Sequence, residues 1–553
     1  MSGHASGAFA RALIASLAEH GVEDYVLSPG SRSGALAHAL AEAGSGNPPL
    51  GAPRVHLHVR IDERSAGFLA LGIARGRAVA GRRAPVAIVT TSGTAVGNLL
   101  PAVMEAHHAG VPLLLLTADR PAELRGVGSN QTTDQVGIFG AFVRWEQDVP
   151  APEPGEGVSR AAALAERAVD AALGKPDRDD MAAAAGPVHL NIGFREPVGA
   201  DGGVWLDPPS PPPPSGAIPI VVPAQRPAPL PAVTRGVVIA GDGAGDAARR
   251  VAEAHGWPLL AEPTSGARTG THCIADYVRL LESPAGEALA ERIHQVVVIG
   301  RPTLTRAVQA LIARAPALIV AGFGARWREA PVHAQAVVRS VPESWWARDD
   351  AVVADASWLA EWRAGGARPA SPEGWGPRVI AAAFLDSLGG PAEGPVGVVG
   401  SSGPIRALDR IMPAARAGAG PVVLANRGLA GIDGTVSTAG GIALGSGRAV
   451  HALMGDVTFL HEAGGLLVGP REERPRARIV VVNDGGGTIF GGLEHGSAPP
   501  DNLERVFTTP HGADLATLCA GYRVPHVEVR SREQLDAALA VPVRTLEVVE
   551  ARV

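Results

Sequence analysis

Two strand-like runs in the C-terminal part of the chain each end in an oxygen-bearing side chain. The run 451–454 leads into Gly455-Asp456, and the run 479–482 leads into Asn483. Neighbouring parallel strands joined by one helix bring their carboxyl ends to the same edge of a sheet, where open α/β sheets bind ligands. We therefore expect the Asp456 carboxylate and the Asn483 amide oxygen to lie close together.

The glycines that follow Asn483 complete a candidate magnesium–diphosphate site. In Asn-Asp-Gly-Gly-Gly, Gly485 can turn a backbone carbonyl inward at little steric cost. Three protein oxygens leave room in an octahedral Mg²⁺ shell for two phosphate oxygens and a water, and Mn²⁺ is an alternative. Glycine N–H groups can also approach a diphosphate. Asp484 remains an alternative ligand to Asn483, which we prefer because of its spacing from Asp456.

This pattern resembles the GD…N motif with which thiamine-diphosphate enzymes hold magnesium and the cofactor diphosphate. It departs from the motif at Val457, where many members have glycine, and at Asp484, where many have a second asparagine. The resemblance implies thiamine diphosphate as the cofactor, with contacts from Gly455, Asp456, Val457, Thr458 and Asn483.

A thiamine-diphosphate enzyme also needs a carboxylic acid against the aminopyrimidine ring, and Glu63 is the candidate. The strand-like run 55–59 leads to Asp62-Glu63, and a helix of small and apolar residues follows. An acid at a helix start is commonly a cap or a partner of the helix dipole, which is the structural alternative. With the magnesium motif present, we expect Glu63 to be the catalytic acid. Thr91, Ser92 and Gly93, after the next strand, are expected to line the same pocket.

Several further segments together resemble one branch of these enzymes, the 2-succinyl-5-enolpyruvyl-6-hydroxy-3-cyclohexene-1-carboxylate synthase family of menaquinone biosynthesis. They are SPGSRS (28–33), DER (62–64), TSGTA (91–95), TADRPAE (117–123), SNQ (129–131), GPVHLNI (186–192), NRGLAGIDG (426–434) and GDVT (455–458). The resemblance covers both outer parts of the chain well and the middle part loosely. It implies decarboxylation of 2-oxoglutarate and 1,4-addition of the resulting succinic-semialdehyde unit to isochorismate.

Both of those substrates are dicarboxylates, and the resemblance implies a substrate site rich in arginine, whose planar fork meets carboxylates bidentately. Ile432 matches the apolar wedge under the bent cofactor, and Ile489 and Phe490 resemble the apolar wall near the second substrate. The positions that match polar substrate contacts are Ser31, Arg32, Arg120, Asn130, Gln131, Arg306, Ser402, Arg406 and Arg427. Any one of these arginines, taken alone, has a solvated surface charge as its structural alternative.

The elements that position these residues alternate between strand and helix. Phe9, Leu13 and Leu17 recur at helical spacing before Gly21. Strand-like runs cover 25–27, 55–59, 85–90, 112–117, 237–240, 296–300, 396–399, 422–425, 451–454 and 479–482. Repeated strand–turn–helix units indicate parallel sheets covered by helices. The fold class is therefore α/β, with three doubly wound domains, and the resemblance implies the thiamine-diphosphate-enzyme architecture.

Domain boundaries follow from proline-rich and glycine-rich stretches. Residues 208–232 are too rich in proline for a helix or an inner strand and indicate an extended linker. We expect a pyrimidine-binding domain at 1–195, a linker at 196–233, a middle domain at 234–370 and a diphosphate-binding domain at 371–553. No internal sequence repeat relates the outer domains. If Glu63 and the diphosphate motif lie in different domains, the family's arrangement implies a homodimer or homotetramer with active sites at the subunit interface.

Composition excludes several classes of function. A net charge of -6 argues against nucleic acid as a partner. The two cysteines form no CxxC pair, and no signal peptide or apolar run of membrane-spanning length is present, so we expect a cytoplasmic protein that does not bind membranes. Lys175 is the only lysine and stands in a polar segment, which argues against Schiff-base and P-loop chemistry.

Three rival interpretations remain at this level. GDGAGD (241–246) suggests a dinucleotide loop, but Asp246 stands where the third glycine of the fingerprint belongs. Another thiamine-diphosphate 2-oxo acid carboligase or decarboxylase, similar to acetolactate synthase, would use smaller and less charged substrates. A catalytically silent binding protein of the same fold would have no reason to retain Glu63, Asp456 and Asn483 together.

Overall fold

The computed structural model describes residues 2–153, 157–175, 184–196, 198–200, 202–205, 230–322, 331, 333–338, 340–347, 355–367, 371–391 and 393–553. The expected linker at 208–232 lies almost wholly outside these residues. The chain forms two compact units: Met1–Val222 with Asp433–Gly447 and His461–Arg476, and Pro223–Ile432 with Arg448–Leu460 and Ala477–Val553. None of the described helices is long and apolar enough to cross a membrane.

The first unit is built on a six-stranded parallel sheet with the order β2-β1-β3-β4-β6-β5. Its strands are β1 (Asp24–Leu27), β2 (His56–Val59), β3 (Val86–Thr90), β4 (Leu113–Asp119), β5 (Glu146–Val149) and β6 (Val188–Gly193). Its helices are α1 (Ser2–Glu19), α2 (Gly34–Ala43), α3 (Glu63–Val79), α4 (Thr94–Gly97), α5 (Leu100–Ala109) and α6 (Gly157–Leu173), and α14 (Thr435–Ser446) packs with them.

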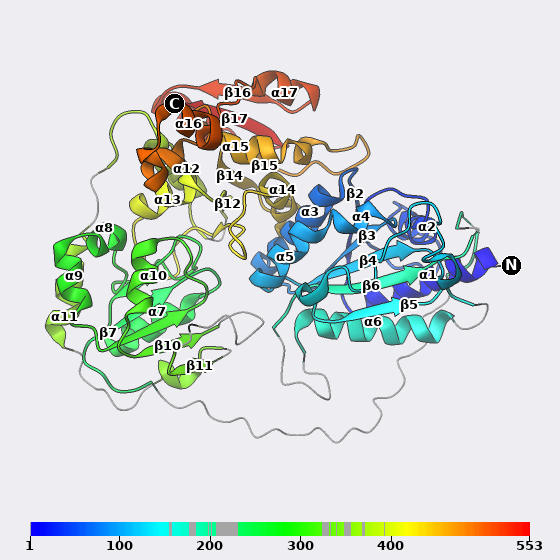
Figure 1. Cartoon of the computed structure of the whole chain (residues 1–553), viewed down its shortest axis with the longest axis horizontal. Helices are drawn as coiled ribbons and strands as arrows, with labels where there is room; N and C mark the ends of the chain where they lie inside the picture. Colours follow the sequence, from blue (N-terminus) through cyan, green and yellow to red (C-terminus); the bar gives the residue numbers. More distant parts are fainter. Residues whose placement is uncertain are drawn as a thin grey trace. The chain divides into compact units, whose positions relative to one another are not determined.

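Two apolar cores cover the two faces of this sheet. One core joins the sheet to α1, α2 and α6, and Phe9, Leu13 and Leu17 of α1 belong to it, as their helical spacing predicts. The other core joins the sheet to α3 and α5. Figure 1 shows α1 and α6 beside the strands of this sheet. The sheet is therefore doubly wound, and loops at its carboxyl edge follow β1, β2, β3 and β4.

The second unit contains two further parallel sheets. The middle sheet has the order β11-β10-β9-β7-β8. Its strands are β7 (Gly236–Ala240), β8 (Leu259–Ala261), β9 (Gln295–Ile299), β10 (Leu318–Ala321) and β11 (Ala336–Val338). Its helices are α7 (Asp246–His255), α8 (Tyr277–Leu281), α9 (Pro284–Ala290), α10 (Arg306–Ala313) and α11 (Ala356–Gly365).

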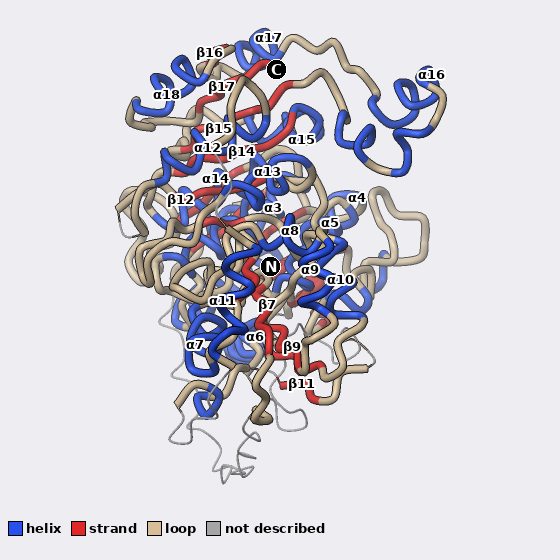
Figure 2. The backbone as a smooth tube through the Cα atoms, turned by 90° about the vertical axis from the view of Figure 1, so that its left-hand side faces the viewer, coloured by secondary structure: helices blue, strands red, loops and turns tan. Residues whose placement is uncertain are grey.

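The third sheet has the order β13-β12-β14-β15-β17-β16. Its strands are β12 (Val396–Val399), β13 (Val423–Leu424), β14 (Val450–Gly455), β15 (Ala477–Asn483), β16 (His526–Val529) and β17 (Glu547–Arg552). The helices are α12 (Pro377–Leu388), α13 (Gly403–Ile411), α15 (Asp456–His461), α16 (Pro500–Leu503), α17 (Leu515–Gly521) and α18 (Arg532–Ala540). Figure 2 shows α12, α13 and α18 beside these strands, and they share one core with them.

The first and third sheets have the same strand order when their strands are numbered from one. The sequence alone does not reveal this relation. Each strand-like run predicted from the sequence coincides with a strand of the structure, and the expectation of parallel α/β sheets is confirmed. The shared order gives the carboxyl edges of the two sheets corresponding loops, after β1 and β12, β2 and β13, β3 and β14, and β4 and β15.

Candidate active site

Asp456 and Asn483 follow neighbouring strands of the third sheet and converge on one backbone N–H. The amide of Gly485 donates to Asp456 Oδ2 at 2.9 Å and to Asn483 Oδ1 at 3.1 Å. Asn483 Nδ2 donates to Glu550 Oε1 at 2.7 Å, which turns the Asn483 oxygen toward Asp456. His511 Nε2 lies 3.1 Å from the same Asp456 oxygen. A carboxylate and an amide oxygen that meet in this way form a donor set suited to Mg²⁺.

The neighbouring Asp484 is engaged elsewhere. Its Oδ2 accepts a hydrogen bond from the Thr488 hydroxyl, and burial, together with the nearby Asp456 carboxylate, raises the pKa of Asp484. Asp484 lines the cavity described next, whereas Asn483 does not. The Asn483 oxygen, however, accepts from the same Gly485 N–H as the Asp456 oxygen. Asn483 as the metal ligand, with Asp484 as the alternative, stays a prediction. Gly485 presents its N–H at this point, whereas the sequence-based expectation concerned its carbonyl.

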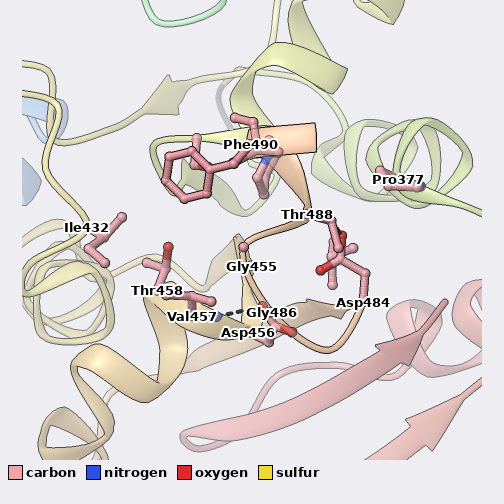
Figure 3. A pocket seen from close by; sticks show the side chains of 16 residues that line it. Pro377, Ile432, Gly455, Asp456, Val457, Thr458, Asp484, Gly486, Thr488 and Phe490 are labelled. Carbon is pink, nitrogen blue, oxygen red and sulfur yellow. Dashed lines mark hydrogen bonds between the residues drawn. The ribbon is translucent and has the colours of Figure 1, made fainter. Parts of the chain in front are cut away.

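A cavity of about 160 Å³ opens beside this loop. In Figure 3, Ile432, Thr458 and Phe490 lie on one side of Gly455, while Asp484 and Thr488 lie on the other. The cavity wall therefore combines apolar side chains, such as Ile432 and Phe490, with polar ones, such as Asp484 and Thr488. Of the residues predicted from the sequence, it is lined by Ser402, Ile432, Gly455, Asp456, Val457, Thr458, Asp484, Ile489 and Phe490.

Ser402 carries an unusual backbone conformation at the cavity wall. Its φ is +87°, a region that favours glycine, and it immediately precedes α13. Strained non-glycine residues of this kind cluster at ligand-binding sites. The Ser402 carbonyl accepts from Arg406 Nη1 at 2.9 Å. This turn therefore also fixes the side chain of Arg406, which is another predicted substrate contact.

Three arginines of the second unit, Arg306, Arg406 and Arg427, are close enough for their positive charges to interact. Arg427 is 3% exposed and donates from Nη2 to Thr303 Oγ1 at 2.6 Å. Burial, and the nearby charges of Arg427 and Arg306, lower the pKa of Arg406. Arg306 is exposed and pairs with Glu494 at 3.1 Å. Like charges held together disfavour one another, and an anionic ligand among them would be stabilised.

In the first unit, Glu63 is the first residue of α3, and its neighbour performs the capping. The Asp62 side chain accepts from Arg64 N at 2.8 Å as the N-cap. Glu63 Oε2 accepts from Asn98 Nδ2 at 3.2 Å. The cap is therefore made by Asp62, whereas Glu63 lies in the first turn of α3, where a carboxylate also interacts favourably with the helix dipole.

Residues after β3 and β4 form a second polar cluster at the carboxyl edge of the first sheet. Arg120 donates to Ser92 Oγ at 3.0 Å and to the Asn130 carbonyl at 2.8 Å. Gln131 Nε2 donates to the Ser92 carbonyl at 2.9 Å, and Gln131 itself has a φ of +56°. Gly93 has a φ of +84°, and a Cβ there would lie 3.0 Å from Gln131 Cγ. The fold thus brings together five residues that the sequence nominated from three separate segments.

Arg32 extends this cluster. It is 7% exposed, and it donates to the Phe194 carbonyl at 2.9 Å and to Glu196 Oε1 at 2.8 Å. Burial and the Arg32 charge lower the pKa of Arg120, while the Glu196 and Asp119 carboxylates partly oppose the shift, so the Arg120 guanidinium is destabilised where it stands. A carboxylate bound beside Arg120 would offset this cost.

The loop after β1 packs closely on the loop after β3. A Cβ on Gly30 would lie 2.2 Å from Thr91 Cβ, so only glycine fits there without displacing Thr91. Ser31, the next residue, is exposed. Thr91 therefore supports the Ser-Pro-Gly-Ser turn, while Ser31 stays accessible at the same edge.

The sequence reasoning missed residues that organise both clusters. Gln135 accepts from Gly93 N at 2.8 Å and donates to Asn191 Oδ1 at 2.9 Å, and Asn191 donates to Asp119 Oδ2 at 2.9 Å. His511 was missed in the third sheet. Gln135 and His511 follow no strand, so strand-end reasoning could not find them, whereas Asn191 lies within a segment already singled out.

Two parts of the chain match sequence profiles of thiamine pyrophosphate enzymes. Residues 8–138 match the profile "Thiamine pyrophosphate enzyme, N-terminal TPP binding domain". Residues 411–548 match "Thiamine pyrophosphate enzyme, C-terminal TPP binding domain". The first match contains Glu63 and the polar cluster around Arg120 (Ser92, Gly93, Asn130 and Gln131), and the second contains Asp456 and Asn483.

Relatives of known name match nearly the whole chain. The 2-succinyl-5-enolpyruvyl-6-hydroxy-3-cyclohexene-1-carboxylate synthase of Nocardioides sp. is 46% identical over 98% of this chain and 94% of its own length. The protein of the same name from Thermobifida fusca is 41% identical over 97% and 94%. Among solved structures, benzoylformate decarboxylase from Polynucleobacter necessarius superposes with a TM-score of 0.68 over 99% of this chain and 98% of its own, at 16% identity. At that identity the likeness concerns the fold.

Proposed function

This chain belongs to the 2-succinyl-5-enolpyruvyl-6-hydroxy-3-cyclohexene-1-carboxylate synthase family of thiamine pyrophosphate enzymes, and we propose that it makes that product from 2-oxoglutarate and isochorismate. The reaction is a thiamine-diphosphate-dependent decarboxylation followed by 1,4-addition, a step of menaquinone biosynthesis. The observation that carries the choice of substrates is the set of mutually repelling arginines at the sheet edges, Arg32 with Arg120 and Arg406 with Arg427. Dicarboxylate substrates would offset that repulsion.

The residues present fit the cofactor. When bound, thiamine diphosphate supplies the nucleophilic carbon that attacks the keto group of a 2-oxo acid and the electron sink for loss of carbon dioxide. Asp456 and Asn483 would hold Mg²⁺, because their oxygens converge and Glu550 orients the amide. The glycine loop and Thr458 would contact the diphosphate, and Ile432 would support the thiazolium side of the cavity.

Glu63 would hold the proton that activates the cofactor's aminopyrimidine. Asp62 caps the helix, so the Glu63 carboxyl is available for a ligand, and Asn98 orients it through one hydrogen bond. General acid–base groups of this kind typically contribute about 10²–10⁴-fold to a rate.

Two groups of residues would bind substrate carboxylates: Arg120 with its neighbour Arg32, and Arg427 with Arg406 and Arg306. Arg120 is held in place by Ser92 and by the Asn130 carbonyl, so its guanidinium is preorganised. A preorganised guanidinium loses less conformational entropy when it binds a carboxylate. The apolar wall of Ile489 and Phe490 would exclude water from the position of the second substrate.

We also propose that the active enzyme contains at least two copies of the chain. Glu63 belongs to one folded unit and Asp456 to the other. The family resemblance implies a cofactor bound between two chains, which supports the proposal. Native mass spectrometry with thiamine diphosphate and Mg²⁺ would report a dimer or tetramer, whereas a strict monomer that retains activity would contradict the proposal.

The test of the proposed function is an omission experiment on the purified protein. Isochorismate absorbance is followed with thiamine diphosphate, Mg²⁺ and 2-oxoglutarate present, and then with each left out in turn. Loss that requires all four components supports the proposal. Cofactor-dependent carbon dioxide release from pyruvate, without isochorismate consumption, would move the chain to another branch. Absence of any cofactor-dependent reaction would favour the silent binding protein.

A further inference from the structure

Glu262 is a buried acid to which neither the sequence motifs nor the proposed mechanism gives a role. It directly follows β8 and is 2% exposed. Its Oε1 accepts from the backbone N–H of Leu304 at 2.8 Å. The Ser265 hydroxyl donates to the Glu262 carbonyl at 2.6 Å, which fixes the turn. The side chain is therefore rigidly placed and reaches the loop between β9 and α10.

That loop, defined as residues 301–306 so that it includes Arg306 at the start of α10, joins the middle sheet to the third. The Leu304 side chain is 4% exposed and belongs to the apolar core of the third sheet. Arg301 Nη2 donates to the Gly428 carbonyl at 3.0 Å, and Thr303 Oγ1 accepts from Arg427 Nη2 at 2.6 Å. Glu262 thus holds the loop whose other contacts position the Asn-Arg-Gly segment around Arg427.

Glu262 and Arg427 also influence each other electrostatically. Among the residues that the structure describes, Glu262 Oε2 and Arg427 Nε are buried atoms without a hydrogen-bond partner. Burial raises the pKa of Glu262 to about 8; the Leu304 N–H and the Arg427 charge oppose that rise, and Asp409 and Asp242 add to it.

The charge of Asp409, which faces Glu262 from α13, is compensated by other groups. It pairs with Arg268 at 2.7 Å, and the Tyr277 hydroxyl donates to both of its oxygens. Burial raises the pKa of Tyr277 well above its usual range, so this hydroxyl keeps its proton. Burial raises the pKa of Asp409 as well, but Arg268 and the Tyr277 hydrogen bond oppose that rise. Glu262 is the acid whose pKa of about 8 makes its ionisation change the charge facing Arg427 near neutral pH.

We propose that Glu262 is a positioning residue that fixes the 301–306 loop through Leu304 and, as a neutral acid, leaves the Arg427 charge to a substrate carboxylate. This inference rests on the proposed function, because it needs Arg427 to bind such a carboxylate. When Glu262 loses its proton, the new carboxylate competes with the substrate for the same guanidinium. The Michaelis constant of that substrate then rises with pH while the turnover number stays level.

The test measures KM and kcat for 2-oxoglutarate and for isochorismate between pH 6.5 and pH 9. If only the protonated enzyme binds, an acid of pKa about 8 reduces the competent fraction to roughly a tenth at pH 9, so one KM rises about tenfold. Glu262→Gln should bind that substrate normally at pH 7 and show a flat KM profile. Glu287→Gln, at an exposed pair with Arg314, is the matched control and should keep the wild-type profile.

A wild-type KM that changes less than about twofold for both substrates overturns the inference, whether or not the Gln variant folds. A rise that persists in Glu262→Gln overturns it as well. Activity that is absent at pH 7 counts instead against the proposed function, so the two failures are distinguishable.

Discussion

Replacement of Asp409 by asparagine should destabilise the second unit far more than an ordinary Asp→Asn change. Asp409 and Arg268 are 1% and 2% exposed, and Arg268 Nη1 lies 2.7 Å from Asp409 Oδ1. Arg268 also donates to the carbonyls of Ala261 at 2.8 Å and Met412 at 2.7 Å. The pair therefore joins the end of the middle sheet to the end of α13.

The magnitude follows from the uncompensated charge. The Asp409→Asn substitution would leave the Arg268 guanidinium buried with neutral partners, and removal of one member of a buried pair typically costs about 3–5 kcal/mol. This is a large fraction of the roughly 5–15 kcal/mol by which domains are stable. We expect the melting temperature of the unit to fall by roughly 5–10 °C.

The assay is thermal unfolding of the variant beside wild type and a surface control. Asp386→Asn removes a carboxylate that is 69% exposed and pairs with Arg532 at 2.9 Å, and exposed pairs contribute about 0–1 kcal/mol. If Asp409→Asn lowers the melting temperature no more than Asp386→Asn does, the buried charge is not what joins these two parts of the unit.

Three further predictions concern the site and the helix that carries Glu63. Asn483→Ala should weaken Mg²⁺-dependent cofactor binding, measured by calorimetry, by more than the roughly 10–100-fold that is typical when a hydrogen-bond partner of a metal ligand is lost. Asp484→Ala should change the same affinity less than about threefold, and the reverse order of effects would make Asp484 the ligand. Glu63→Gln should lower kcat by about 10²–10⁴-fold with cofactor affinity nearly unchanged, and full activity would remove Glu63 from the mechanism. Gly441→Ala would place a Cβ 2.2 Å from a backbone carbonyl oxygen of α3 and should lower the free energy of unfolding in urea by about 1–3 kcal/mol. Gly97→Ala, where a Cβ would have no atom within 4 Å, should lower it by less than about 0.5 kcal/mol, and equal effects would mean that α3 and α14 do not pack closely.

Strand ends were the most predictable part of the molecule. Short apolar runs followed by glycine or a polar residue identify the strands. Because parallel strands end at one edge, the sequence alone predicts that Asp456 lies near Asn483, and in the structure both side chains accept from the Gly485 N–H. Which of Asp62 and Glu63 caps the helix could not be predicted, because both residues can do so and only the side-chain contacts show that Asp62 is the cap. The catalytic role of Glu63 stays a prediction.

Contacts between distant segments could not be predicted. The common strand order of the first and third sheets depends on which apolar faces are buried, and many different sequences satisfy that requirement. Leu304 reads as an ordinary loop residue, yet it packs in the core of another sheet. Glu262 follows a three-residue strand and carries no motif, so its burial and its bond to Leu304 are visible only in three dimensions.

In the proposed reaction, one active site couples decarboxylation of 2-oxoglutarate to consumption of isochorismate. The most direct measurement is the stoichiometry of the two processes in a single reaction with thiamine diphosphate and Mg²⁺, by carbon dioxide trapping and isochorismate absorbance. We expect one carbon dioxide released for each isochorismate lost, and no sustained release when isochorismate is omitted. Rapid carbon dioxide release that is independent of isochorismate would contradict it and identify a simple decarboxylase.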